Sequence, residues 1–108
     1  MRYAVLLTQD AARDLAELHA CITRQEGAAG ADHVLDEIGK LFERLERFPN
    51  RGPHPEELLS LGIREYRQVF FKPYRLIYRV IEDRVYVLLV ADGRRDMQTL
   101  LQRRLLHG

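Results

Sequence analysis

The chain has 108 residues, a single cysteine and a formal net charge of +1, so one domain over residues 1–108 can bury a core of its own without an internal disulfide. A hydrophobic fraction of 46% and a charged fraction of 31% exclude a disordered, fibrous or low-complexity protein. The apolar run near the start is too short for a signal peptide or a membrane span, and one cysteine suits a reducing compartment, so we expect a soluble, cytoplasmic protein.

The first third of the chain predicts a strand followed by a helix. Arg2–Leu7 is rich in strand-forming residues. Thr8 is a suitable N-cap for a helix from Gln9 to about Glu26, whose leucines and isoleucine recur at helical spacing. We expect the helix to be broken by the stretch Gly27–Gly30.

A second helix is predicted more strongly. Apolar residues recur in it at alternating spacings of four and three, at Val34, Ile38, Leu41, Leu45 and Phe48. The pattern ends at Pro49–Pro55, where three prolines and a glycine cannot continue a helix. The apolar stripe covers about two heptads, which is short for a coiled coil. We therefore expect the two helices to form a hairpin that packs on the chain's own sheet.

The second half changes to a period of two. Three strands joined by short turns are predicted, at Arg64–Phe71, Tyr74–Ile81 and Arg84–Ala91. The last of them is apolar on both faces, as expected of a central strand. Asp96 can cap a final helix from Met97 to about Leu106. The order β-α-α-β-β-β-α predicts an α+β fold, with a helical hairpin on an antiparallel sheet and a short basic C-terminal helix.

Most kinds of active site are not indicated. The four histidines, His19, His33, His54 and His107, have no cysteine, histidine or carboxylate at a matching metal-ligand spacing. No glycine-rich phosphate loop follows a strand. Cys21 lies within a predicted helix without a histidine partner. We expect neither a metal nor a cofactor.

Arginines of the second half remain as candidates. Residues 1–60 carry seven Lys and Arg against eleven Asp and Glu, whereas residues 61–108 carry ten against five, which favours an anionic partner for the second half. Six arginines lie in the third strand, after the fourth strand or in the last helix: Arg75, Arg79, Arg94, Arg95, Arg103 and Arg104. Guanidinium groups there could bind a phosphate or stabilise charge during cleavage. They could equally pair with the chain's own carboxylates.

The stretch GIREYRQVFFKPYRLIYRVIEDRVYVLLVADGRRD (Gly62–Asp96) resembles the RelE/ParE superfamily of toxins from bacterial type II toxin–antitoxin systems. The most specific features are the Tyr-Arg-aliphatic start of the third strand and the Gly-Arg-Arg exit of the fourth. The resemblance covers essentially the whole chain. It implies a small toxin that a cognate antitoxin neutralises in a hetero-oligomer. RelE-like members are ribosome-dependent endonucleases that cut mRNA, whereas ParE-like members poison DNA gyrase.

The nuclease residues of RelE-like toxins are only partly present. The family uses two lysines on the second strand, two arginines and a tyrosine; the arginine positions match Arg75 and Arg95. The lysine positions fall on Tyr66 and Gln68, and the tyrosine position on Leu101. Glutamine and leucine cannot exchange a proton and arginine stays protonated, so the general base and acid of RNA cleavage are missing unless Tyr66 replaces them.

The resemblance therefore implies a ParE-type inhibitor of DNA gyrase in which the six arginines bind the target. The alternatives are a ribosome-dependent mRNA endonuclease that uses Arg75, Arg95 and Tyr66, and a degenerate, non-toxic member that only sequesters antitoxin.

Overall fold

The structure, a computed structural model, describes residues 2–107. Its elements are β1 (Ala4–Leu7), α1 (Gln9–Glu26), α2 (Ala28–Arg47), α3 (Glu56–Leu59), β2 (Tyr66–Phe71), β3 (Tyr74–Ile81), β4 (Arg84–Asp92) and α4 (Met97–His107). The predicted element order is confirmed, with one addition. The short helix α3 lies between the second helix and the second strand, where no element was predicted. No helix in the described residues is both long and apolar enough to cross a membrane.

The helical hairpin has a tighter turn than predicted. The Thr8 hydroxyl accepts a hydrogen bond from the amide of Ala11 at 3.1 Å and caps α1, as expected. Gly27 alone separates α1 from α2, and its φ of +89° is a conformation that favours glycine. The expected break over Gly27–Gly30 is therefore too long, because alanines and Gly30 continue directly into α2.

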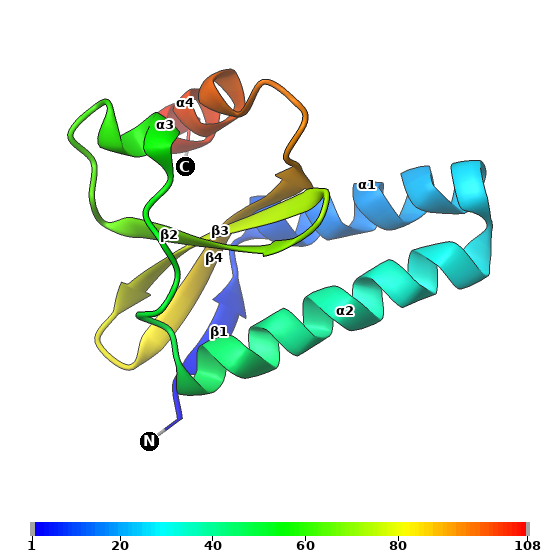
Figure 1. The fold of residues 1–108 in the computed structure, drawn as a ribbon, viewed down its shortest axis with the longest axis horizontal. Coiled ribbons are helices and arrows are strands. Elements are labelled where there is room, and N and C mark those ends of the chain that lie inside the picture. The colour runs from blue at the N-terminus through cyan, green and yellow to red at the C-terminus, as the bar shows by residue number, and fades with distance from the viewer. Residues whose placement is uncertain (1, 108) are drawn as a thin grey trace.

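The four strands form one mixed sheet in the order β1-β4-β3-β2 (Figure 1). β4 lies between β1 and β3, which explains its apolar residues on both faces. β2, β3 and β4 pair antiparallel, but β1 pairs in parallel with β4, with Ala4 opposite Arg84. The sheet is thus mixed rather than entirely antiparallel as predicted. A two-residue turn requires antiparallel neighbours, whereas the long helical connection after β1 allows either direction.

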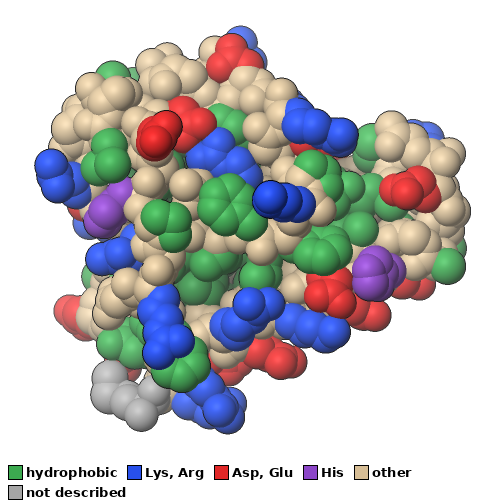
Figure 2. Space-filling model, viewed as in Figure 1, with side chains coloured by type: hydrophobic (Ala, Val, Ile, Leu, Met, Phe, Trp, Pro, Cys, Tyr) green, Lys and Arg blue, Asp and Glu red, His purple; other side chains and the backbone are tan. Residues whose placement is uncertain are grey.

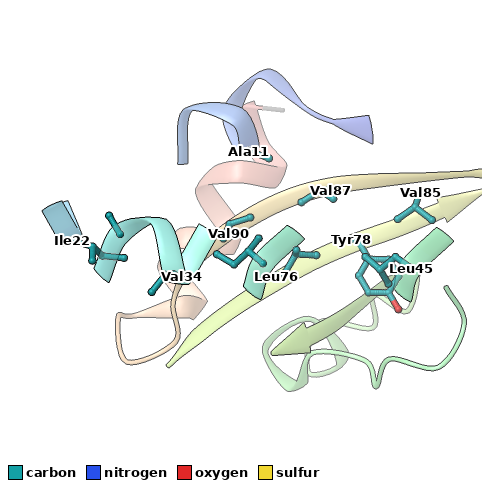
Figure 3. Close-up of a cluster of buried hydrophobic side chains, with 11 residues drawn as sticks. Ala11, Ile22, Val34, Leu45, Leu76, Tyr78, Val85, Val87 and Val90 are labelled. Atoms are coloured by element: carbon teal, nitrogen blue, oxygen red, sulfur yellow. The ribbon is translucent and has the colours of Figure 1, made fainter. Parts of the chain in front are cut away.

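Helices cover both faces of the sheet (Figure 1). On one face the apolar stripe of α2 packs as predicted, with Val34, Ile38 and Leu45 against Leu76 and Tyr78 of β3 (Figure 3). Each of these side chains is at most 8% exposed. At about 25 cal/mol per Å² of buried apolar surface, this cluster supplies much of the driving force for folding. Phe48, which the predicted stripe included, instead follows the last residue of α2 and is 47% exposed.

The opposite face holds a second, smaller cluster. Ile77 of β3 and Leu89 of β4 pack there with Leu58 of α3 and Leu101 of α4. Ile77 alternates with Leu76 and Tyr78 along β3, so neighbouring residues of one strand serve two different cores. Arg75 and Arg79 lie on the same face of β3 as Ile77, which is the face on which α3 and α4 pack.

The loop between α2 and α3 covers the outer edge of β2. Pro53 accepts a hydrogen bond from the amide of Gln68 at 2.9 Å, and Pro49 accepts one from the hydroxyl of Tyr78 at 2.6 Å. Gly52 is buried between these contacts, and a Cβ at this position would lie 2.6 Å from the Tyr78 hydroxyl. The proline-rich segment thus satisfies polar groups of an edge strand that would otherwise be open to other chains.

Candidate functional site

Arg75, the arginine that opens β3, is held in a fixed position by two side chains. Its Nη1 and Nη2 donate to the two carboxylate oxygens of Glu57 at 2.8 and 2.9 Å, and its Nε donates to Oε1 of Gln68 at 3.0 Å. Only 12% of the Arg75 side chain is exposed. A two-pronged ion pair of this geometry is among the stronger polar contacts in proteins. All three guanidinium nitrogens therefore donate to the protein itself.

Glu57 comes from α3 and was not predicted as part of a site. The hydrogen bonds from Arg75 lower the pKa of Glu57 below its ordinary value of 4.5, and they outweigh the opposing effect of partial burial. Glu57 is consequently an anion at neutral pH. Eighteen residues separate it from Arg75, and no spacing in the sequence indicates the pairing.

Gly93, just after β4, lies against the stem of Arg75. A Cβ on Gly93 would be 2.7 Å from Cδ of Arg75, and the Gly93 amide donates to the carbonyl of Pro73 at 2.7 Å. The glycine of the Gly-Arg-Arg exit therefore leaves room for Arg75 to reach Glu57. This is the structural reason for a feature that the sequence analysis used only as a family mark.

An open pocket of about 330 Å³ adjoins this ion pair. Pro53, His54, Glu56, Glu57, Gln68, Phe70 and Arg75 line it. His54 lies 2.9 Å from the carbonyl of Tyr66 through Nδ1. Because a carbonyl only accepts, Nδ1 is the donor in this contact. The pocket thus brings His54 close to a guanidinium whose three nitrogens already donate to Glu57 and Gln68.

Tyr66 and Arg79 form a separate pair beside this pocket. They are opposite each other in β2 and β3, and the Arg79 guanidinium carbon lies 5.9 Å from the centre of the Tyr66 ring. The Nε of Arg79 is buried, with no hydrogen-bond partner in the described residues. The Tyr66 ring packs against the smaller core cluster. The structure therefore places the Tyr66 ring on Arg79 and does not bring it into the pocket of Arg75.

Arg94 and Arg95 follow Gly93, just after β4, and lie apart from the pocket of Arg75. They line a pocket of about 530 Å³ between α1 and the end of the sheet. The Arg94 side chain is 78% exposed and pairs with Asp92 at 2.6 Å, and this contact is the main reason that the pKa of Asp92 is lowered. Arg95 is exposed. The two arginines that match the RelE-like pattern, Arg75 and Arg95, thus line different pockets.

The two arginines of α4 differ sharply. Arg104 is 16% exposed, binds both carboxylate oxygens of Asp14 at 2.8 and 2.9 Å and donates to the carbonyl of Leu88 at 2.7 Å. It fastens α4 to α1 and β4. Arg103 is exposed and makes no ion pair in the described part of the chain. Of the six predicted arginines, Arg75 and Arg104 are paired inside the protein and Arg79 is half-buried beside Tyr66. The other three, Arg94, Arg95 and Arg103, are exposed, and Arg94 among them pairs with Asp92.

Comparison with known proteins identifies the family. Residues 5–97 match the sequence model of the family described as ParE toxin of type II toxin-antitoxin system, parDE. Toxin ParE3 of Caulobacter vibrioides is 28% identical over 97 residues, which cover 90% of this chain and 93% of that protein.

Solved structures share the fold. A chain of the chromosomal ParDE system of P. aeruginosa aligns with a TM-score of 0.70 at 18% identity, over 84% of this chain and 96% of that one. A chain of the toxin–antitoxin complex RelBE2 of Mycobacterium tuberculosis aligns with a TM-score of 0.63 at 24% identity, over 85% and 99%. An E. coli RelE mutant in the free state aligns less closely, with a TM-score of 0.52 at 16% identity, over 95% and 98%. The chain belongs to the ParE toxin family of type II toxin–antitoxin systems.

Proposed function

We propose that this ParE-type toxin arrests growth by inhibiting DNA gyrase. The supporting observation concerns Gln68 and Leu101, which occupy positions where RelE-like toxins carry acid–base residues. Gln68 is buried and hydrogen-bonded to Arg75, and Leu101 is completely buried in the smaller core. Neither side chain can exchange a proton with RNA. Membership of the ParE family supports the same reading.

The test is a gyrase supercoiling and DNA-cleavage assay with the purified protein, run beside a ribosome-plus-mRNA cleavage assay. Loss of supercoiling with accumulated cleaved DNA and intact mRNA is the expected result. Cut mRNA with unaffected gyrase would contradict the proposal. No effect in either assay would favour a degenerate member that only binds antitoxin.

A ribosome-dependent endonuclease is a second candidate because of one observation. The pocket beside Arg75 contains His54 and Glu57, which were not predicted as site residues, and an imidazole is a side chain that can serve in acid–base catalysis. However, Arg75 already donates to Glu57 and Gln68. In the mRNA assay, codon-phased cuts that disappear in His54→Ala would establish this candidate. Cuts that disappear only in Tyr66→Phe would assign the role to Tyr66 instead.

We also propose a cognate antitoxin as a partner, in a hetero-oligomer. Two of the similar structures come from toxin–antitoxin systems, ParDE and RelBE2. In this chain β1 is an edge strand, and its Leu6 and Leu7 are 41% and 39% exposed. An edge strand with exposed apolar side chains suits a flexible segment that becomes ordered on binding. Co-expression of this chain with a candidate antitoxin tests this part: the two proteins should co-purify, and the complex should no longer inhibit gyrase.

A further inference from the structure

The C-terminal half of α2 and the segment before β1 enclose a groove that lies apart from the pockets described above. It is open, with a volume of about 700 Å³, and its lining includes the cations Arg2, Lys40, Arg44 and Arg47. Figure 2 shows Lys and Arg side chains gathered in the lower part of the view, around the C-terminal half of α2. These cations are concentrated on one surface even though residues 1–60 as a whole carry more acidic than basic residues.

Much of this positive charge is not neutralised. Lys40 pairs with Glu37 at 3.0 Å and Arg2 with Glu46 at 3.7 Å. Arg44 and Arg47 make no ion pair within residues 2–107, and Glu43 is the one lining carboxylate without such a partner there. The groove therefore presents a net positive charge to whatever enters it.

A further arginine, Arg51, stacks on the aromatic ring of Phe48, one of the residues that line the groove. The guanidinium carbon of Arg51 lies 4.1 Å from the centre of the Phe48 ring, and Phe48 also lines the groove. Arg51 has no carboxylate partner in the described residues. Stacking on the ring orders the guanidinium while its N–H groups stay free. Arg51 is thus a cation that is positioned by Phe48 and has no carboxylate partner among the described residues.

Helix stability alone does not explain this arrangement. Arg44 and Arg47 lie in the last turn of α2 and complement its dipole. Arg2 belongs to a segment outside the helix, however, and the fold brings it to the same groove, while Arg51 stacks on the lining residue Phe48. Lys40, Arg44 and Arg47 are four and three residues apart on one helix face and span about 10 Å at 1.5 Å per residue. One strand of a DNA duplex carries a phosphate about every 3.4 Å along the duplex axis, so a row of cations of this length can face several phosphates.

We propose that this groove binds the phosphate backbone of nucleic acid without sequence preference. Arginine is suited to phosphate because its planar guanidinium donates two parallel hydrogen bonds, and the three unneutralised cations are all arginines. The proposal does not depend on gyrase inhibition, since binding to nucleic acid is measured without gyrase.

The experiment measures fluorescence anisotropy of a fluorescein-labelled 20-base-pair DNA duplex with the purified full chain at about 50 to 200 mM salt. Neutralisation of three or four phosphates predicts a slope of about −2.7 to −3.6 for log K against log salt. The variant Arg44→Gln/Arg47→Gln/Arg51→Gln should flatten the slope by about 2.7 and weaken binding at least tenfold at the lowest salt.

The matched control is Arg13→Gln/Arg24→Gln/Lys72→Gln, which removes the same charge from exposed side chains outside the groove. It should keep a slope close to that of the unmodified chain, and far-UV circular dichroism should show both variants folded. Absence of DNA binding, or equal slopes for the two variants, would overturn the proposal. Preference for polyglutamate over DNA in competition would also overturn it and would indicate an acidic protein segment as the occupant.

Discussion

Arg75 illustrates how a single side chain can serve the fold as well as a function. It lies on the sheet face of the smaller core, where a lone charge would be costly, and its ion pair with Glu57 and its hydrogen bond to Gln68 offset that cost. Arg95, three residues after β4, is exposed and has no such partner within residues 2–107. The two arginines that match one functional pattern in the sequence therefore have different physical roles.

Replacing these arginines separately should separate stability from function. Arg75→Ala leaves the Glu57 carboxylate partly buried without its partner, so we expect the free energy of unfolding to fall by about 2 kcal/mol. Arg95→Ala should change it by less than about 0.5 kcal/mol. Urea unfolding followed by circular dichroism measures both. Equal stability of the two variants would mean that the Glu57 pair contributes nothing to the fold.

The Glu57 pair should also make stability depend on acid pH. The pKa of Glu57 is lower in the folded protein than its ordinary value of 4.5, so the unfolded chain binds the proton first as pH falls. Stability from this group is complete above pH 4.5 and is lost as pH falls through the folded pKa. Glu57→Gln should flatten the unfolding free energy against pH below 4.5. An unchanged pH profile in the variant would contradict this assignment.

At the scale of elements, the segments between helices and strands hold the site together. The loop Pro49–Pro55 covers the edge of β2, and α3 supplies Glu57 to Arg75 and Leu58 to the core. α4 is fastened through Arg104 to Asp14 and contributes Leu101 to the same core. Removing α4 would therefore expose this core, so point substitutions test its role in target binding more directly than truncation.

Gly52 should be the least replaceable residue of the loop. A Cβ there would lie 2.6 Å from the Tyr78 hydroxyl and would also meet the Gln68 carbonyl, so Gly52→Ala must displace the loop or the strand. We expect a loss of more than about 2 kcal/mol of unfolding free energy. Gly39→Ala is the control: apart from its chain neighbours and the nearby backbone of α2 itself, no atom of the described residues lies within 4 Å of its added Cβ, and alanine should stabilise α2 by about 0.5 to 1 kcal/mol. Thermal unfolding of both variants decides the comparison.

For the whole molecule, folding redistributes the charges that the sequence separates into an acidic and a basic half. Arg75 and Arg104 of the basic half are paired inside the protein, whereas Arg44, Arg47 and Arg51 of the acidic half form a basic surface. Charge counts along the chain therefore describe the molecular surface poorly.

The exposed arginines of the second half should carry gyrase inhibition. Arg95 and Arg103 are exposed without ion pairs in the described residues, so Arg95→Ala/Arg103→Ala should leave the fold intact. We expect the concentration needed to block supercoiling to rise at least about tenfold, as for the loss of about 1.4 kcal/mol of binding free energy. Lys72→Ala, another exposed cation, is the control. Unaltered inhibition by the double variant would remove both arginines from the target-binding surface.

Local pattern was sufficient for most of the fold. Helical spacing predicted the buried face of α2 around Ile38 and Leu45, and alternation predicted β2, β3 and β4 within about two residues. The residues of Gly62–Asp96 were enough to indicate the toxin family, which the comparison confirmed. These features depend on residues a few positions apart, so their physical cause is visible in the sequence itself.

Tertiary structure alone decided the direction of β1 and the composition of the site. Ala4–Leu7 can pair in either direction, and its parallel alignment with β4 is set by how the helical hairpin returns to the sheet. Glu57 meets Arg75 across eighteen residues, and His54 meets Tyr66 across twelve, through loops without a spacing rule. Arg2 likewise reaches the end of α2 only in the folded chain. Contacts of this kind depend on the packing of distant segments, and no local periodicity encodes them.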